Sequence, residues 1–366
     1  MQFHRANRKR PDHLKPTIVG TGLVALDVVF GGDCASAETA LGGSAGNVLA
    51  ILGHLGWHAV PVAQLGKDAA AVRIASEFSK LGADTRFLMQ SQKLATPVVY
   101  QLPGGTGHSH EFSFRCPICG RKRGFVSPTD DVAALSHLGL IGEPDVFYFD
   151  RVTPWALEPA ERYRQAGTLV VFEPSTVEGN SASFKRAVRA SHVLKYADDR
   201  VADMQSVDLS CVDVEIQTHG KHGLRFRVSE QAGGWHHLNA LAVPYVTDTA
   251  GAGDWCTSGF LYALVGSIIE SGGRGQLSTR RVRESLRLGQ IFAALNCMEK
   301  GARGLARRHK AEQLITLATS IRNSMVSFIP QAPKTAKAEP AMGREAVPHA
   351  PISGISSLLC CEALAG

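Results

Sequence analysis

The sequence has no long hydrophobic run. Its most apolar helical stretch, residues 260–269, is much shorter than the roughly 20 residues that a membrane-spanning helix needs. The basic start of the chain is followed by Pro11, Asp12 and His13 rather than by an apolar segment, which argues against a secretory signal. We therefore expect a cytoplasmic protein with no membrane partner.

A disulfide framework and a nucleic-acid-binding pattern are also lacking. Half of the eight cysteines are scattered singly among apolar residues, as reduced core thiols are. The formal net charge is +6, but the basic residues cluster at the start of the chain and within residues 303–310 instead of interleaving with aromatic residues. We expect no nucleic-acid partner, and anionic ligands such as ATP suit the charge equally well.

Helix-period segments alternate with short apolar runs through most of the sequence, which predicts a parallel sheet flanked by helices. The expected strands are nearly continuously apolar, as strands buried on both faces are: residues 17–24, 59–65, 146–149, 168–172, 192–194 and 212–217. The expected crossover helices are amphipathic and include residues 68–81, 155–165 and 183–190. Right-handed crossovers then give an open, doubly wound α/β domain.

Two portions break this rhythm, residues 28–41 and 96–124, and period-2 alternation in the second predicts antiparallel strands. We expect both to form a small β lid over one edge of the large domain, which would span residues 17–329. A basic arm at residues 1–16 and a Pro-, Ala- and Lys-rich tail at residues 330–366 are expected to be disordered. The run Leu-Leu-Cys-Cys inside this tail is a candidate for a weak docking element.

The strongest functional motif is the turn Thr-Ala-Gly-Ala-Gly-Asp, which ends at Asp254 and leads into an apolar helix. The start of a helix offers unpaired N–H groups, and the helix dipole adds positive potential there. Gly251 and Gly253 let the backbone approach a phosphate, and Ala252 adds almost no bulk. The Asp254 carboxylate can then accept the proton of an attacking hydroxyl. The alternative is an ordinary helix N-cap.

The extended motif Asp-Thr-Ala-Gly-Ala-Gly-Asp resembles the carboxy-terminal signature of the ribokinase-like, or PfkB, carbohydrate kinase family. Residues 42–47, Gly-Gly-Ser-Ala-Gly-Asn, resemble the amino-terminal Gly-Gly signature of that family, and the two motifs occur in the family's order. The resemblance covers roughly residues 17–325. It implies a mostly parallel sheet with a small β lid, and ATP-dependent phosphorylation of a hydroxyl or hydroxymethyl group on a sugar or sugar-like molecule.

The resemblance also implies roles for single residues. Asp254 would be the catalytic base, and the N–H groups of residues 251–253 would form the anion hole. The acceptor would be bound by Asp27, Gly42, Gly43 and Asn47. A carboxylate accepts two hydrogen bonds from a sugar diol, and an amide side chain offers both a donor and an acceptor. A turn-forming role for Asp27 and helix capping by Asn47 are the alternatives.

The nucleotide side is assigned by the same resemblance. The turn Thr-His-Gly-Lys-His-Gly resembles the family's phosphate-contacting turn and contributes Thr218, Gly220 and Gly223, although it could equally be a plain hairpin turn. Gln290 falls where the family often lines its adenine pocket. Three further positions resemble the elements that hold a monovalent cation such as K⁺: Asp248, the carbonyl of Ala250, and Gly301.

One departure from the family concerns magnesium. Relatives tend to carry an Asn-x-x-Glu element that orders water around Mg²⁺, whereas this chain has Ala197 and Arg200 at those two positions. Asp198 or Asp199 could replace this element, because Mg²⁺ keeps several waters and needs only a carboxylate at hydrogen-bonding distance. Glu173, at the end of an expected parallel strand, could serve equally well.

A second departure is the sequence Cys-Pro-Ile-Cys-Gly inside the expected lid. The spacing of Cys116 and Cys119 is that of a zinc knuckle, but one pair supplies only half of a tetrahedral site. His108 and His110 could complete a structural zinc site, two lids could share four cysteines across a dimer, or the thiols could be free. The following basic residues 121–123 could reach an anionic group on the substrate. A homodimer is expected, because exposed strand edges of such lids seek partners.

Two alternatives to a sugar kinase remain at this point. A nucleoside kinase shares both signatures, and Phe112 and Phe114 of the lid could stack on a base as readily as they could cover a sugar. A catalytically silent relative would bind a sugar or nucleotide without turnover. The altered magnesium element and the cysteine pair favour this second alternative slightly, whereas the intact turn before Asp254 argues against it.

Overall fold

The computed structural model describes residues 15–30, 37–103, 110–128, 141–175, 181–198, 204, 207–229, 234–271, 277–326, 360 and 363. The expected arm and tail therefore lie almost wholly outside the described residues. Within these residues, no helix combines the length and the apolar character that crossing a bilayer requires.

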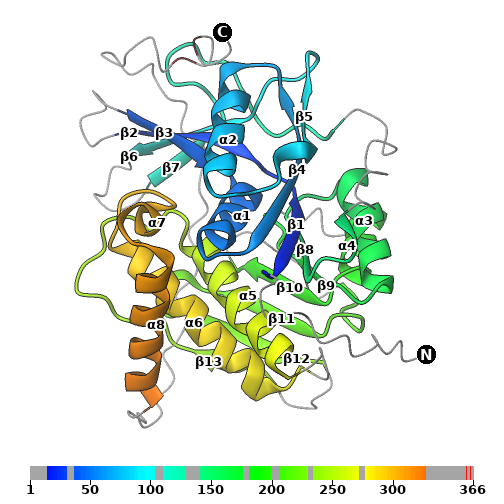
Figure 1. The fold of residues 1–366 in the computed structure, drawn as a ribbon, viewed down its shortest axis with the longest axis vertical. Coiled ribbons are helices and arrows are strands. Elements are labelled where there is room, and N and C mark those ends of the chain that lie inside the picture. Colours follow the sequence, from blue (N-terminus) through cyan, green and yellow to red (C-terminus); the bar gives the residue numbers. More distant parts are fainter. Residues whose placement is uncertain are drawn as a thin grey trace.

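A nine-stranded sheet forms the centre of the molecule, in the order β13-β12-β11-β10-β9-β8-β1-β4-β5 (Figure 1). The strands from β11 to β5 pair in parallel, and β12 and β13 add two antiparallel pairings at one edge. This confirms the mostly parallel sheet. The strands are β1 Thr17–Thr21, β4 His58–Gly66, β5 Leu88–Ser91, β8 Val146–Phe149, β9 Leu169–Phe172, β10 Val193–Ala197, β11 Val214–Thr218, β12 Leu224–Val228 and β13 His236–Leu238.

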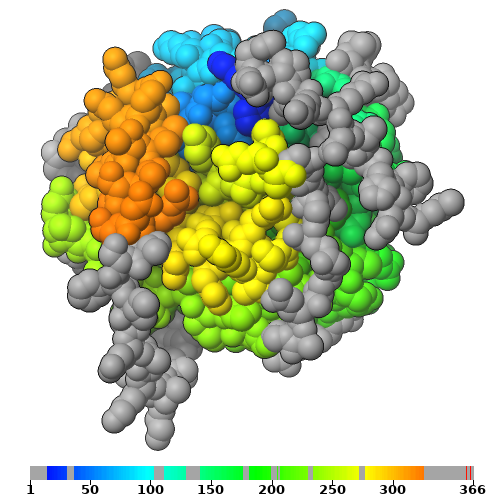
Figure 2. Space-filling model, turned by 60° about the horizontal axis from the view of Figure 1, so that its bottom comes forward, coloured from blue at the N-terminus to red at the C-terminus, as the bar shows by residue number. Residues whose placement is uncertain are grey.

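Helices cover both faces of this sheet, so the doubly wound arrangement is confirmed (Figure 1). One face carries α1 Ser44–His54, α2 Ala69–Lys80, α5 Ala252–Glu270 and α6 Thr279–Cys297, and the other carries α3 Pro154–Gln165 and α4 Ala182–Arg189. Two further helices, α7 Gly304–Arg308 and α8 Ala311–Val326, follow α6. Figure 2 shows α8, in orange, lying against the yellow surface of α6.

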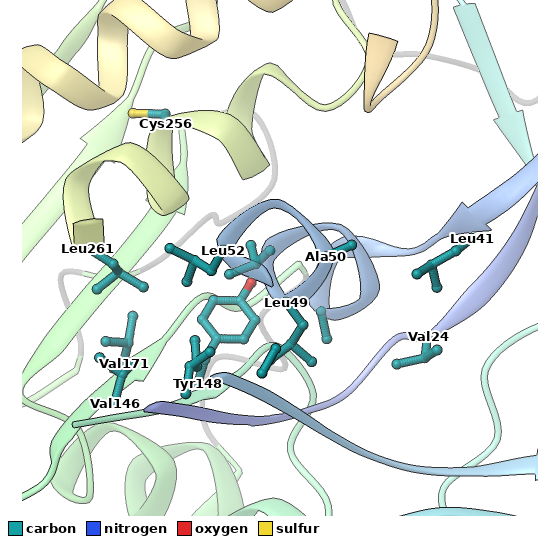
Figure 3. Packing of buried hydrophobic residues seen from close by; sticks show 14 of the residues in the cluster. Val24, Leu41, Leu49, Ala50, Leu52, Val146, Tyr148, Val171, Cys256 and Leu261 are labelled. Atoms are coloured by element: carbon teal, nitrogen blue, oxygen red, sulfur yellow. The ribbon is translucent and has the colours of Figure 1, made fainter. Parts of the chain in front are cut away.

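Burial on both faces explains the continuously apolar strands. In β8 all four residues are buried, with Tyr148 directed to one face and Phe147 and Phe149 to the other. Figure 3 shows Tyr148 below α1, in the same cluster as Leu261 of α5. On the opposite face, Phe149 stacks on Phe172 of β9 with ring centroids 4.5 Å apart. Strands with no solvated face carry no period-2 signal, as the sequence shows.

The expected β lid is present as a separate four-stranded sheet in the order β3-β2-β6-β7, formed by β2 Ala25–Phe30, β3 Ala37–Gly42, β6 Val98–Pro103 and β7 His110–Ser113. β2 with β3 and β6 with β7 are antiparallel pairs, and β2 joins them by pairing in parallel with β6. The expected first strand, residues 17–24, is too long, because the Leu23 amide leaves the large sheet to donate to Asp150 Oδ1 at 2.9 Å. Asp27 therefore lies within β2 of the small sheet, not just after the first strand of the large one.

Candidate active site

The turn before α5 has a conformation that only glycine supports at one position. Gly251 has φ +73°, and a Cβ added there would lie 2.3 Å from the carbonyl oxygen of Ala302. Asn296 on α6 donates its Nδ2–H to the carbonyl of Ala250 at 2.9 Å, which fixes the other side of the turn. The glycine and the buried amide together hold the start of α5 in place.

The amide groups of this turn are only partly used by the protein. Ala252 N donates to the carbonyl of Thr249 at 3.2 Å, so it closes the turn. Within the described residues, the amides of Gly251 and Gly253 have no hydrogen-bond acceptor. A Cβ built on Gly253 would meet nothing within 4 Å, so this residue faces open space. Two of the three expected anion-binding amides are thus free to bind a ligand, and the third is engaged.

Asp254 lies in the first turn of α5 and is partly buried. Its Oδ2 accepts a hydrogen bond from Asn47 Nδ2 at 2.8 Å, across a sequence separation of 207 residues. Burial, with a further contribution from the nearby Glu173 carboxylate, raises the pKa of Asp254 to about 8. The structure therefore brings the two sequence motifs together and gives the carboxylate the affinity for a proton that a base near neutral pH needs.

The acceptor-side residues of the sequence analysis lie next to this pair. Asn47 donates its backbone N–H to the carbonyl of Gly43 at 2.7 Å in the first turn of α1, and its side-chain Nδ2 donates to Asp254. A Cβ on Gly42 would lie 1.9 Å from the carboxyl carbon of Asp27, so the missing side chain makes room for that carboxylate. Burial raises the pKa of Asp27 to about 7, although Arg303 and the backbone of Gly43 oppose the rise.

Two oxygen atoms in this region lack a protein partner. Within the described residues, Asp27 Oδ1 and Asn47 Oδ1 are buried and accept no hydrogen bond. An unpaired buried acceptor carries a desolvation penalty of about 1–3 kcal/mol. These two oxygens are therefore suited to accept hydrogen bonds from the hydroxyl groups of a ligand.

Sequence reasoning missed a buried ion pair at the same edge of the sheet. Lys195 of β10 pairs with Glu173, which follows β9, and the Lys195 ammonium is also 3.4 Å from the Gly253 carbonyl. Thr257 Oγ1 donates to Glu173 Oε2 at 2.7 Å. Burial alone would lower the pKa of Lys195, but Glu173, with smaller contributions from Cys256 and Asp254, raises this pKa overall. A lysine inside an otherwise apolar strand is the signal that could have identified this pair.

Asp150, at the end of β8, is a second residue that sequence reasoning missed. Its carboxylate is buried and accepts hydrogen bonds from the Leu23 amide, the Ser44 hydroxyl and the Ala45 amide. It therefore ties the end of β1 to the start of α1. This contact positions the glycine pair that precedes α1.

The three residues considered for a monovalent cation also lie together. Asp248 accepts hydrogen bonds from the amides of Ala250 and Gly301, both at 2.8 Å, and from Gln101 Nε2 at 3.1 Å. The Ala250 carbonyl accepts from Asn296. The Asp248 carboxylate and the Ala250 carbonyl thus already accept hydrogen bonds from the protein. A bound cation would share these oxygens with the protein donors that stabilise the turn.

The nucleotide-side residues are mostly engaged by the protein. Gln290 donates to the carbonyls of Leu238 and Asn239 at 3.2 and 3.1 Å, so it fastens the end of β13 to α6. Gly223 has φ +95°, and a Cβ there would lie 2.1 Å from the Leu238 carbonyl. Thr218 ends β11, and a short 3₁₀ helix, η4 Gly220–His222, follows it. Within this turn the amides of His219, His222 and Gly223 donate to backbone carbonyls of the same turn.

The carboxylates considered for magnesium differ in their surroundings. Asp198 binds His219 Nδ1 at 2.5 Å on the nucleotide-side turn. Ala197 ends β10, whereas Asp199 and Arg200 lie outside the described residues. Glu173 is the candidate that lies close enough to Asp254 to affect its pKa.

The lid residues fall into two groups. Phe114 is packed against the small cluster of Leu23, Ala25 and Val99 and serves as core, whereas Phe112 is 54% exposed. Arg123 does not reach a free anion, because it is buried and forms an ion pair with Asp68 at 2.7 Å.

Cys116 and Cys119 lie in a tight turn after β7, and His108 lies outside the described residues. A pocket is lined by Gly22, Gln64 and Phe125 among others, and its lining includes neither Asp254 nor the expected acceptor-side residues.

The fold defines a class of protein, the ribokinase-like fold. A ribokinase from Giardia lamblia has a similar structure, with a TM-score of 0.67 and 16% identity, over 84% of this chain and 99% of that chain. A fructokinase from Xylella fastidiosa with bound ATP gives 0.66 and 16%, with the same coverage. Aminoimidazole riboside kinase from Salmonella enterica, in complex with aminoimidazole riboside and an ATP analog, gives 0.61 and 20%, over 82% and 99%.

The sequence identifies the family more narrowly. The pfkB family carbohydrate kinase profile matches residues 118–308, just over half of the chain, and the chain belongs to this family. No curated protein matches the sequence. The matched residues include the turn before α5 but neither Asp27 nor residues 42–47. The profile match therefore does not extend to the expected acceptor-side residues.

Proposed function

We propose that this protein transfers the terminal phosphoryl group of ATP to a hydroxyl or hydroxymethyl group of a sugar or sugar-like small molecule, with Asp254 as the base. One observation carries the proposal. The Asp254 carboxylate lies beside the free amides of Gly251 and Gly253 and is hydrogen-bonded to Asn47 of the acceptor side. A base, an anion site and a hydroxyl-binding site thus meet at one helix start.

The proton transfer follows from the contacts of Asp254. Because Asn47 donates to Oδ2, the other oxygen, Oδ1, is left to accept the proton of the attacking hydroxyl. A pKa of about 8 places this base near the pH at which a cytoplasmic enzyme would work, where general bases are most effective. Asp27 and Asn47 would orient the acceptor by accepting hydrogen bonds from its other hydroxyls.

The phosphoryl group would be stabilised by the start of α5. The amides of Gly251 and Gly253 would donate to its oxygens, and the dipole of α5 adds positive potential. Lys195 keeps a positive charge next to the Gly253 carbonyl. Magnesium supplied with ATP would neutralise charge on the phosphate oxygens. Glu173 would take an outer-sphere role toward it, because this carboxylate lies close enough to Asp254 to raise its pKa.

Two accompanying proposals follow the family resemblance. We propose that K⁺ supports the turn through Asp248, Ala250 and Gly301, and activation by K⁺ but not by Na⁺ would be the expected result. We also propose a homodimer formed through the small sheet, whose edge strands β3 and β7 have no further strand partner among the described residues. Light scattering of the purified protein tests this second proposal.

The test of the main proposal is ADP release with a panel of pentoses, hexoses and nucleosides. We expect turnover with one acceptor class, and the identity of that class separates a sugar kinase from a nucleoside kinase. Asp254→Asn should lower kcat by about 10³-fold, since general bases contribute 10²–10⁴-fold, while ATP still binds. Asp208→Asn, at an exposed turn, is the matched control and should keep full activity. ATP binding without turnover for any acceptor would instead support a catalytically silent relative.

A further inference from the structure

The carboxyl-terminal end of the chain meets the lid through one cysteine. Cys360 is only 8% exposed and belongs to the same buried cluster as Cys116, with Ile118 packed against it. The Sγ atoms of Cys116, Cys119 and Cys360 all lie within 4.8 Å of one another. In Figure 1, the short dark red trace at the top, near residue 360, lies beside the teal coil that follows β7. Sequence spacing alone could not reveal this third thiol.

The two lid cysteines lie in a turn that is already shaped for a metal. Gly120 N donates to the Cys116 carbonyl, and Cys116 N donates to the Arg121 carbonyl, both at 2.9 Å. Gly120 has φ +71°, which allows the chain to reverse directly after Cys119. An antiparallel bridge between Arg115 and Lys122 closes the turn. Backbone bonds of the protein thus hold both thiols on one side of the turn.

We propose that Cys116, Cys119 and Cys360 bind a structural Zn²⁺ ion that fastens the carboxyl-terminal end of the chain to the lid. Zinc–sulfur bonds of about 2.3 Å in a tetrahedron place thiolates about 3.8 Å apart, so only small side-chain movements are needed. A site made of thiolates favours zinc over the hard cations Mg²⁺ and Ca²⁺. Three thiolates around Zn²⁺ leave one negative charge, and the basic residues Arg115, Arg121 and Lys122 flank the turn.

The position of the turn indicates what the metal would stabilise. Arg123, directly after the turn, donates its backbone N–H to the Phe114 carbonyl at 2.8 Å, and its carbonyl accepts from the Val98 amide of β6 at 2.9 Å. Its side chain pairs with Asp68, the N-cap of α2. The zinc ion would therefore link the end of the chain to the small sheet and to the large domain. It would act on stability and not on the proton transfer at Asp254.

The experiment measures zinc content and affinity in full-length protein purified under reducing conditions without chelators. Wild type should carry about one zinc per chain. Zinc binding should be weaker by more than about 100-fold in each of three variants, Cys360→Ser, Cys116→Ser and Cys119→Ser. Mutating a residue that only hydrogen-bonds to a metal ligand lowers affinity by about 10- to 100-fold, and loss of a ligand itself should cost more. Cys211→Ser, a partly exposed cysteine outside the cluster, is the matched control and should bind zinc as wild type does.

Cobalt substitution adds a readout that does not depend on stability. The thiolate-to-cobalt charge-transfer band of wild type should lose intensity in Cys360→Ser, because one sulfur ligand is gone. Circular dichroism and ATP binding of the same variant show that it is folded. The proposal is overturned if folded Cys360→Ser keeps wild-type zinc affinity, or if only Cys361→Ser abolishes binding. It is equally overturned if reduced wild type binds no zinc, or if non-reducing mass spectrometry finds two of the three cysteines in a disulfide.

Discussion

The acceptor side and the nucleotide side of the site differ in how far the protein satisfies its own polar groups. On the acceptor side, Asp27 Oδ1 and Asn47 Oδ1 are buried without a partner within the described chain. On the nucleotide side, Gln290 is bonded to two carbonyls, and Gly223 is packed against the end of β13. The comparison indicates that the acceptor side leaves buried side-chain oxygens for a ligand, whereas the protein itself uses the Gln290 side chain on the nucleotide side.

The difference has a consequence for stability. Unpaired buried acceptors destabilise the empty protein, and a ligand that donates hydroxyls removes that penalty. On the nucleotide side, Gln290 Nε2 already donates to two backbone carbonyls without a ligand. Substitutions on the first side should therefore affect function most, and substitutions on the second side should affect stability more than turnover.

Among the substitutions that compare the acceptor side with the nucleotide side, the largest effect is expected for Asp27→Ala. Hydrogen bonds to a charged group contribute about 1.5–3 kcal/mol each, so the loss of two bonds to the acceptor should lower kcat/KM for that acceptor by about 100-fold or more. The KM for ATP should not change. Steady-state kinetics with each substrate varied in turn provides the measurement, and an equal rise of both KM values would show that the two sides are not distinct.

Asp27→Asn tests the burial of the acceptor-side carboxylate through the pH dependence of the free energy of unfolding. The pKa of Asp27 is about 7 in the folded protein and has an ordinary value of 3.8. At a pH between these two values, Asp27 is therefore protonated in the folded protein but ionised in the unfolded chain. The free energy of unfolding should therefore fall as pH rises from about 4 to about 7. In Asp27→Asn this part of the pH dependence should disappear, and chemical denaturation across that pH range measures it.

An intermediate effect is expected for Gly42→Ala. Its Cβ would overlap the Asp27 carboxylate, and overpacking of this kind destabilises by about 1–3 kcal/mol. Gly253→Ala is the matched comparison, because a Cβ there meets no protein atom within 4 Å. Gly253→Ala should keep the unfolding temperature but lower turnover, since the methyl group enters the proposed phosphoryl site. A lower unfolding temperature for Gly253→Ala than for Gly42→Ala would contradict this assignment.

The smallest functional effect is expected for Gln290→Ala. The substitution removes two hydrogen bonds to carbonyls after β13 and should destabilise the protein by about 1–2 kcal/mol, at about 1 kcal/mol for each bond. The KM for ATP should rise only a few-fold. Thermal unfolding and ATP titration measure the two quantities, and a 100-fold loss of ATP affinity without destabilisation would make Gln290 a direct nucleotide ligand.

The sequence predicted those parts of the structure that depend on local patterns. Apolar runs marked the buried strands, and the turn ending at Asp254 could be placed at a helix start because its glycines and the following helix are contiguous. The small sheet was recognised from its period-2 strands. The first strand of the small sheet begins at Ala25, earlier than the predicted residue 28. The end of β1 that precedes it depends on the hydrogen bond from the Leu23 amide to Asp150, 127 residues away.

The remaining parts depend on contacts between distant residues. The pair of Lys195 with Glu173 unites the ends of two strands, and no local pattern predicts which buried charge meets which. Gln290 was assigned to a ligand but is used by the protein, because its partners are backbone carbonyls 52 and 51 residues away. The meeting of Cys360 with the lid cysteines likewise required the fold.

The most direct test of the central claim is the pH dependence of phosphoryl transfer in a single turnover, with the acceptor that the panel identifies. For wild type the transfer rate should rise with pH up to about 8, where Asp254 loses its proton, and then level off. Asp254→Asn should show a rate about 10³-fold lower with no such rise. A wild-type profile that Asp254→Asn reproduces in both shape and magnitude would contradict the account.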